Sequence, residues 1–318
     1  MNHRHLSTLF HLPRLVHLST LGPYQTHQQA GAASVTLPSF LKSLIFFKSC
    51  PSLNTIFSSA SPATGLEELM ISNYTELTSL AEPIGDLLPC LRKLTILPTR
   101  LDILVGLKRL ELTGCEELSR PPAHLPTSLE TLCLGSFRRG ASHVVDISQL
   151  SQLRVLKLNC VGVRCGRAVS SRFSCPQQLE ILEMYLERDS QELPVFLTSI
   201  CLPSLRSLLI CAPRVCSLPV NMVTAFPQLL HLRLLSWLPE ELPGVLLELR
   251  SLTSLAIEAP QLVALPQGMS CLSRLRKLEL IGCSALEHLP ESLTQLHHLI
   301  LNCTSVPYLP PIFVRLRR

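Results

Sequence analysis

Charged residues are scarce in this chain of 318 residues. They make up 16% of it, whereas hydrophobic residues make up 47%. Aromatic residues contribute only 5%, with a single tryptophan. Most of the chain is therefore available for a buried aliphatic core. No apolar run approaches the ~20 residues that span a bilayer, so we predict no membrane association.

The motifs that carry catalysis are absent as well. The sequence has no G-x-x-x-x-G-K-[ST] phosphate loop, no G-x-S-x-G elbow, no H-E-x-x-H and no kinase signature. The nearest approach to an elbow, Gly268-Met269-Ser270-Cys271, lacks the closing glycine. His297 and His298 straddle the start of an expected strand, so their imidazoles point in different directions. We therefore predict no enzymatic activity, no cofactor, no metal and no small-molecule substrate.

One local phrase, L-x-x-L-x-[LIFM], recurs twelve times at a mean spacing of about 23 residues. Its copies start at Leu41, Leu66, Leu91, Leu107, Leu129, Leu153, Leu179, Leu205, Leu229, Leu252, Leu275 and Leu296. A fixed period of this length is typical of a leucine-rich-repeat solenoid. The step from Leu91 to Leu107 is short, which indicates either a clipped return segment or a slipped register.

Alternation within the phrase predicts a strand with one buried face. In the copy from Leu107 to Leu112, the leucines alternate with Arg109 and Glu111. One such strand buries little alone, but parallel stacking of successive copies gives a continuous core. We predict an α/β solenoid, a leucine-rich-repeat horseshoe with a parallel sheet on its concave face and irregular or short helical return segments. The prolines, 25 in all, fall mainly in these segments.

The repeats predict a domain over residues 41–318 and a different segment over residues 1–40. That first segment has no acidic residue, and its Leu15 lies one repeat length before Leu41. We expect one or two degenerate coils or a cap, with a targeting segment or disorder as alternatives. The apolar tail at 307–318 lacks the polar cap that solenoids use, which suggests a fragment or paralogue of a larger receptor.

The net charge of +5 is a mild excess, and we predict no nucleic-acid partner. Between residues 136 and 176 the sequence has seven basic residues and only one acidic residue, Asp146. This stretch is interpreted as a solvated convex face, with an acidic-partner or intramolecular docking patch as the alternative.

The thirteen cysteines are scattered through the chain, which indicates core packing in a reducing compartment. The pairs Cys160/Cys165 and Cys211/Cys216 lie two repeats apart, too far to converge on zinc readily. We predict a cytoplasmic protein, with the nucleus or an organelle as alternatives.

The predicted sheet leaves one face for a protein partner. Twelve strands at roughly 4.8 Å would give a surface about 55 Å long, enough for a standard interface. The residues expected to bind on this concave face are Met70, Arg109, Glu111, Lys157, Ile181, Glu183, Tyr185, Leu209, His231, Arg233, Lys277 and Glu279. Arg109 beside Glu111 and Lys277 beside Glu279 also fit ordinary charge pairing. Trp237 is either a further anchor or an inward-facing spacer.

The stretch from Leu275 to Leu293, with Cys283 and Leu289-Pro290, resembles the repeat L-x-x-L-x-L-x-x-C-x-x-L-x-x-L-P-x-x-[IL] of plant nucleotide-binding leucine-rich-repeat disease-resistance proteins. The ninth position of the phrase is cysteine only at Cys115 and Cys283. The resemblance implies a recognition module for defence or autoregulation that binds a protein. Two further functions stay open, namely an intracellular scaffold for signalling proteins and a substrate receptor of a ubiquitin ligase.

Overall fold

In the part of the chain that it describes, a computed structural model shows thirteen short strands and three short helices. The described residues are 15–21, 40–47, 65–72, 90–94, 104–112, 125–135, 147, 149–159, 176–186, 190–194, 197, 201–215, 217–290 and 293–302. The strands are β1 (His17–Leu21), β2 (Ser43–Phe47), β3 (Glu68–Ser72), β4 (Lys93–Leu94), β5 (Arg109–Leu112), β6 (Thr131–Gly135), β7 (Val155–Asn159), β8 (Ile181–Tyr185), β9 (Ser207–Cys211), β10 (His231–Leu235), β11 (Ser254–Glu258), β12 (Lys277–Ile281) and β13 (His298–Asn302).

Each copy of the leucine phrase forms one strand, and that strand begins two residues after the first leucine of the copy. The first leucine of every copy is buried, because it turns inward just before the strand. In β10, Leu232 and Leu234 are buried while His231 and Arg233 are exposed. The period of two that predicted the strands is thus the alternation between core and surface.

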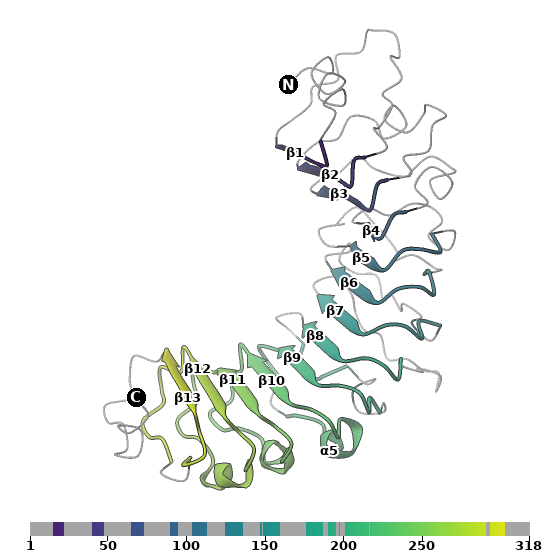
Figure 1. Ribbon diagram of the computed structural model, residues 1–318. Helices are drawn as coiled ribbons and strands as arrows, with labels where there is room; N and C mark the ends of the chain where they lie inside the picture. Colours follow the sequence, from purple (N-terminus) through teal and green to yellow (C-terminus); the bar gives the residue numbers. More distant parts are fainter. Residues whose placement is uncertain are drawn as a thin grey trace. The chain divides into compact units, whose positions relative to one another are not determined.

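The chain divides into two compact units. One comprises Met1–Ala141 with Gln149–Leu153, and the other comprises Ser142–Ser148 with Arg154–Arg318. Strands β1 to β6 belong to the first unit and β7 to β13 to the second (Figure 1). Within each unit, every paired strand runs parallel to its neighbour, and equivalent residues of successive repeats stand opposite each other. The fold is therefore a leucine-rich-repeat solenoid, as predicted.

The short step after Leu91 does not change the register. Lys93 pairs with Glu68 on one side and with Arg109 on the other, and Leu94 pairs with Leu69 and Leu110. These are equivalent positions of the phrase, so the slipped-register alternative is wrong. Strand β4 has only two residues.

A tight turn precedes most strands. The backbone N–H of the first leucine donates to the carbonyl three residues earlier, as in Leu107 to Leu104 at 3.0 Å and Leu275 to Leu272 at 2.9 Å. Both leucines of such a pair are buried. The repeat therefore anchors the chain to the core one turn before the strand, which fixes where the strand starts.

The described return segments of the second unit contain short helices. Helix α5 spans Met222–Ala225, and the 3-10 helices η1 and η2 span Gly244–Glu248 and Gln267–Cys271. Pro243 and Pro266 stand directly before η1 and η2, where a fixed φ suits a helix start and no ladder donor is lost. The prediction of irregular or short helical return segments is confirmed.

The residue after the strand explains why the ninth position of the phrase varies. Ser236 and Gly282 adopt the left-handed conformation, with φ of 55° and 59°. The chain then turns so that the ninth residue, Trp237 or Cys283, enters the core. After β9 and β11 the residue directly following the strand, Ala212 or Ala259, is buried instead. In these two repeats the ninth residue of the phrase is a proline. Because the alanine before it is buried, the proline is not required to fill the core.

A strand also forms at His17–Leu21, two residues after Leu15, and it pairs with β2. Whether residues 1–40 as a whole form degenerate coils stays a prediction, because most of them lie outside the described residues. The apolar tail at 307–318, Cys115 and most of the basic stretch at 136–176 lie outside them too.

Candidate functional site

The sheet has a core face and an outer face, the latter formed by the strand side chains that point away from the core. Three sets of side chains follow one another across it. The pre-strand column holds the residue just before each strand, the first column holds the first strand residue, and the second column holds the third. Pairing of equivalent residues aligns each column within its unit, as in Val155, Ile181, Ser207, His231, Ser254, Lys277 and His298 of the first column.

Eleven of the twelve residues expected to bind a partner lie at positions that solvent reaches. Arg109, His231 and Arg233 are exposed, while the other eight are half-buried. Met70 and Glu111 belong to the first unit and the remaining binding candidates of the second column to the second unit. Thr95, the expected member of the second column in β4, lies outside the described residues. That these residues bind a partner stays a prediction.

The expectation of an exposed Leu209 is wrong, because its side chain keeps only 5% of its surface accessible. Leu209 occupies the second column as predicted, between Glu183 and Arg233 in register. Neighbouring strands lie about 4.8 Å apart, so the longer side chains on both sides shield a leucine between them. Leu209 therefore supports the sheet surface and offers little area to a partner.

The two alternatives for Trp237 are decided in favour of the inward-facing spacer. The side chain is fully buried, and its Nε1 lies 3.5 Å from the Glu241 carbonyl oxygen. Its backbone N–H donates to the Glu258 carbonyl at 2.8 Å. Trp237 is thus removed from the candidate anchors.

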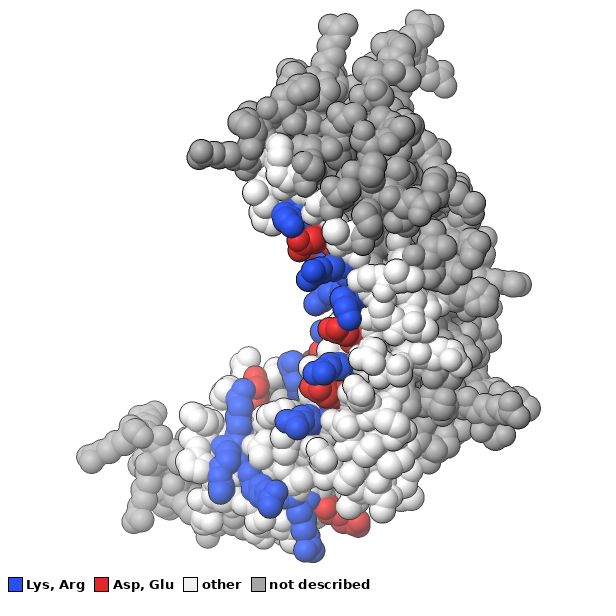
Figure 2. Space-filling model, turned by 45° about the vertical axis from the view of Figure 1, so that its right-hand side comes forward, with Lys and Arg blue, Asp and Glu red and all other residues white. Residues whose placement is uncertain are grey.

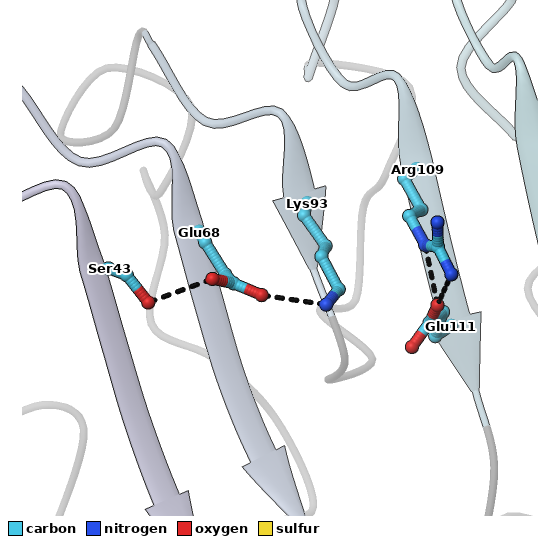
Figure 3. Close-up of polar contacts among 5 residues, drawn as sticks. All are labelled: Ser43, Glu68, Lys93, Arg109 and Glu111. Carbon is cyan, nitrogen blue, oxygen red and sulfur yellow. Dashed lines mark hydrogen bonds and ion pairs between the residues drawn. The ribbon is translucent and has the colours of Figure 1, made fainter. Parts of the chain in front are cut away.

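Charged side chains in the first unit satisfy one another across strands (Figure 3). The Ser43 hydroxyl donates to Glu68 at 2.8 Å, and the Lys93 ammonium pairs with the other Glu68 oxygen at 2.7 Å. These three residues stand in register on β2, β3 and β4. On β5, Arg109 instead turns along its own strand to Glu111. The predicted pairing of Arg109 with Glu111 is confirmed, as is that of Lys277 with Glu279.

The Glu68 cluster predicts a pH dependence of stability. The hydrogen bond from Lys93, and more weakly that from Ser43, hold the pKa of Glu68 below its usual value near 4.5. As the pH falls, the Glu68 carboxylate therefore takes up a proton in the unfolded chain before it does so in the folded protein. The stabilisation from this carboxylate is present above its usual pKa and is lost as the pH falls through its lowered pKa in the folded protein. We expect Glu68→Gln to weaken the decrease in the free energy of unfolding between pH 6 and pH 3.

The check is chemical denaturation at a series of pH values for the parent protein and for Glu68→Gln. Glu240→Gln, at an exposed position of a return segment, controls for the removal of one carboxylate. An unchanged pH profile in Glu68→Gln would contradict the role given to the Lys93 ion pair.

The pre-strand column was missed in reading the sequence, although it carries a periodic signal. From Lys42 to Arg206 its charges alternate in sign from one repeat to the next, except where Lys108 follows Arg92. They form the ion pairs Lys42–Glu67, Lys108–Glu130 at 2.8 Å and Arg154–Glu180 at 3.3 Å. In the second column, Lys157 pairs with Glu183 at 2.9 Å. Arg154 and Lys157 come from the basic stretch at 136–176, and both lie on the outer face of the sheet, so for these two the convex-face interpretation is wrong. Each has an acidic partner in the next repeat.

The described part of the chain brings together no group of three or more histidine, cysteine or acidic side chains that could hold a metal. Of the four cysteines in the two spaced pairs, only Cys211 is described, and its thiol lies 3.7 Å from the Ser236 hydroxyl. His297 and His298 are both exposed.

Within the described ranges, no helix has the length and apolar character that crossing a bilayer demands.

Comparisons with known proteins add little to this description. No family model matches the chain, and no curated protein matches it. A solved structure of a leucine-rich-repeat protein from Leptospira interrogans is 22% identical, covers 89% of this chain and 90% of its own, and has a TM-score of 0.39. A similarity at this level does not bear on function, and the fold assignment rests on the strand register.

Proposed function

We propose that the chain is a non-catalytic recognition module that binds a protein partner on the outer face of its sheet. The observation that carries the proposal is the separation of roles between alternate strand residues. One set fills the core, whereas the first and second columns are accessible to solvent at every described position except Ser43, Cys133, Leu209 and Ala256. Stacked repeats characteristically use such extended surfaces for binding.

The size of the outer face supports this function. Six strands in the first unit span about 24 Å and seven in the second span about 29 Å, at roughly 4.8 Å per step. With strands about 17 Å long, the face of either unit has a flat area of about 400–500 Å², which fits an interface at the small end of the known range, below about 1,200 Å² in total. Arginine and tyrosine are frequent hot-spot residues, and both occur on the outer face of the second unit, at Arg233 and Tyr185.

A defence or autoregulatory role of the plant immune-receptor type is the finer form of this proposal. It rests on the stretch from Leu275 to Leu293, in which every apolar position of the motif is buried. The Cys283 thiol lies 3.8 Å from the Ile257 carbonyl oxygen of the preceding repeat, so this cysteine links adjacent coils. None of the six described cysteines forms a disulfide bond, which agrees with the proposed cytoplasmic location.

Affinity capture from extract of the cells that express the protein tests the proposal. A variant with alanine at Met70, Glu111, Glu183 and Arg233, here called the outer-face variant, is expected to lose capture of its partner, because these side chains stand at equivalent positions of the second column. The matched control places alanine at Val220, Glu240, Glu248 and Arg214, which lie in the return segments and have the same mix of side-chain types.

The control variant is expected to capture the partner as the parent protein does. Both variants are first compared with the parent by circular dichroism and chemical denaturation, so that a loss of fold is not mistaken for a loss of binding. Unchanged capture by the outer-face variant would show that the partner binds elsewhere, and the proposal would then be wrong.

A further inference from the structure

The charges on the outer face are distributed unequally, and this points to the chemistry of the partner. From β2 to β8, most described acidic and basic residues of the face take part in the ion pairs between repeats given above. Figure 2 shows stretches where blue basic residues lie next to red acidic ones, and another where blue predominates. On the strands β9 to β13 and at the positions just before them, the outer face carries more basic side chains than acidic ones.

Six exposed basic residues on this part of the face form what we call the basic patch: Arg206, His231, Arg233, Arg276, His297 and His298. Among the described residues, none of the three arginines makes an ion pair. The Arg276 guanidinium is held by a hydrogen bond from its Nη1 to the Gln295 carbonyl at 3.2 Å, and the side chain is exposed. All six belong to the second unit, so the patch does not depend on how the units are placed.

The backbone ladder places the patch residues at regular intervals. The backbone carbonyl of Arg206 accepts a hydrogen bond from the N–H of Leu230. In the same way, the Leu230 carbonyl accepts from Thr253, the Thr253 carbonyl from Arg276 and the Arg276 carbonyl from His297. The nitrogen and oxygen atoms of these bonds lie 2.8–2.9 Å apart. Arg206 and Arg276 therefore stand three repeats apart, or about 14 Å at the usual strand spacing. His231 and His298 flank the same rows in the first column.

We infer that β9 to β13 bind an acidic segment of a polypeptide that lies across the strands. The inference rests on the proposed function and names the partner chemistry for the same face. Unpaired arginines in fixed rows complement carboxylates, which they can bind with two parallel hydrogen bonds. Ile300, with 42% of its surface exposed, adds an apolar contact that suits a peptide side chain.

A nucleic acid fits this part of the face less well. Glu258 and Glu279 lie on it and repel phosphates. The outer-face strand positions of β9 to β13 contain no phenylalanine, tyrosine or tryptophan, so the rings available for base stacking there are limited to His231 and His298. The four cationic side chains, Arg206, Arg233, Arg276 and Lys277, outnumber the acidic ones by only two, which is few for binding dominated by phosphate contacts.

Fluorescence anisotropy with a labelled glutamate-rich peptide of about six residues tests the inference, since five strands span about 19 Å and an extended chain covers roughly 3.3 Å per residue. Arg206→Glu, Arg233→Glu and Arg276→Glu together, the patch variant, are expected to weaken binding at least about tenfold. The matched control, Arg214→Glu, Arg250→Glu and Arg274→Glu, changes the net charge equally at exposed positions of the same unit outside the outer face and is expected to weaken binding less than about twofold. Lysine at the three patch positions keeps the charge but not the paired hydrogen bonds of arginine, so it is expected to restore only part of the affinity.

Equal losses in the patch variant and its control would overturn the inference, because only total charge would then matter. Equal binding of a lysine-rich peptide of the same length would overturn it as well. Tighter binding of a single-stranded oligonucleotide that the patch variant loses would identify a nucleic-acid face instead. If the patch variant unfolds, glutamine at the three positions removes the charge without reversing it. If the patch variant keeps peptide binding while the outer-face variant still loses its captured partner, the inference fails and the proposed function stands.

Discussion

Replacing Trp237 with alanine is expected to lower the free energy of unfolding by about 3–5 kcal/mol, the range for large buried aromatic side chains. The indole is fully buried in the second unit and is the largest side chain in its core. Ser236 turns the chain inward just before it, so the backbone holds the cavity open after truncation. Equilibrium denaturation followed by circular dichroism measures the loss.

Two neighbouring changes control this experiment. Trp237→Phe keeps most of the buried area and is expected to cost clearly less than the alanine change. Leu238→Ala alters the next residue, which is exposed, and is expected to change stability by no more than about 0.5 kcal/mol. A loss below about 1 kcal/mol in Trp237→Ala would mean that the indole is not part of the core.

Adjacent residues on β10 are expected to respond in opposite ways to the same substitution. Leu232→Ala should cost about 2–5 kcal/mol, because it leaves a cavity at a fully buried position. Arg233→Ala should change stability by no more than about 0.5 kcal/mol, because its side chain is exposed and makes no ion pair within the described residues. The two variants are compared by denaturation under identical conditions.

The same pair separates stability from binding. Arg233→Ala is expected to weaken binding of the acidic peptide while leaving the fold intact. Similar stability losses in both variants would contradict the assignment of alternate residues to the core and to the surface. This contrast therefore tests the strand alternation at one position of the repeat.

The position and register of the strands could be predicted from the sequence because the repeat determines both. A leucine that turns inward and two that alternate with polar residues have one stable arrangement, which is to stack in parallel on the next copy. The register at Lys93 and Arg109 follows the same rule despite the short step. Each repeat must align its leucines with those of its neighbours, whatever the length of the return segment.

Features that depend on the backbone or on neighbouring side chains could not be predicted in this way. The inward turn of Trp237 follows from the left-handed φ of Ser236. A serine in the sequence does not predict a left-handed conformation at that position. The burial of Leu209 depends on the side chains beside it in register. The ion pairs before the strands were predictable in principle, because Lys42, Glu67 and Arg92 alternate in sign at the repeat period. That position precedes the strand, so the alternation within the strand does not by itself assign it to the outer face.

Site-specific photo-crosslinking tests the central claim, that a partner binds the outer face of the sheet, most directly. A benzophenone amino acid is placed in the expressing cells at Arg233 on β10 or, for comparison, at Val220, which is 88% exposed in a return segment. We expect a covalent adduct with a partner protein from position 233 and none from position 220. An adduct from position 220 alone would contradict it.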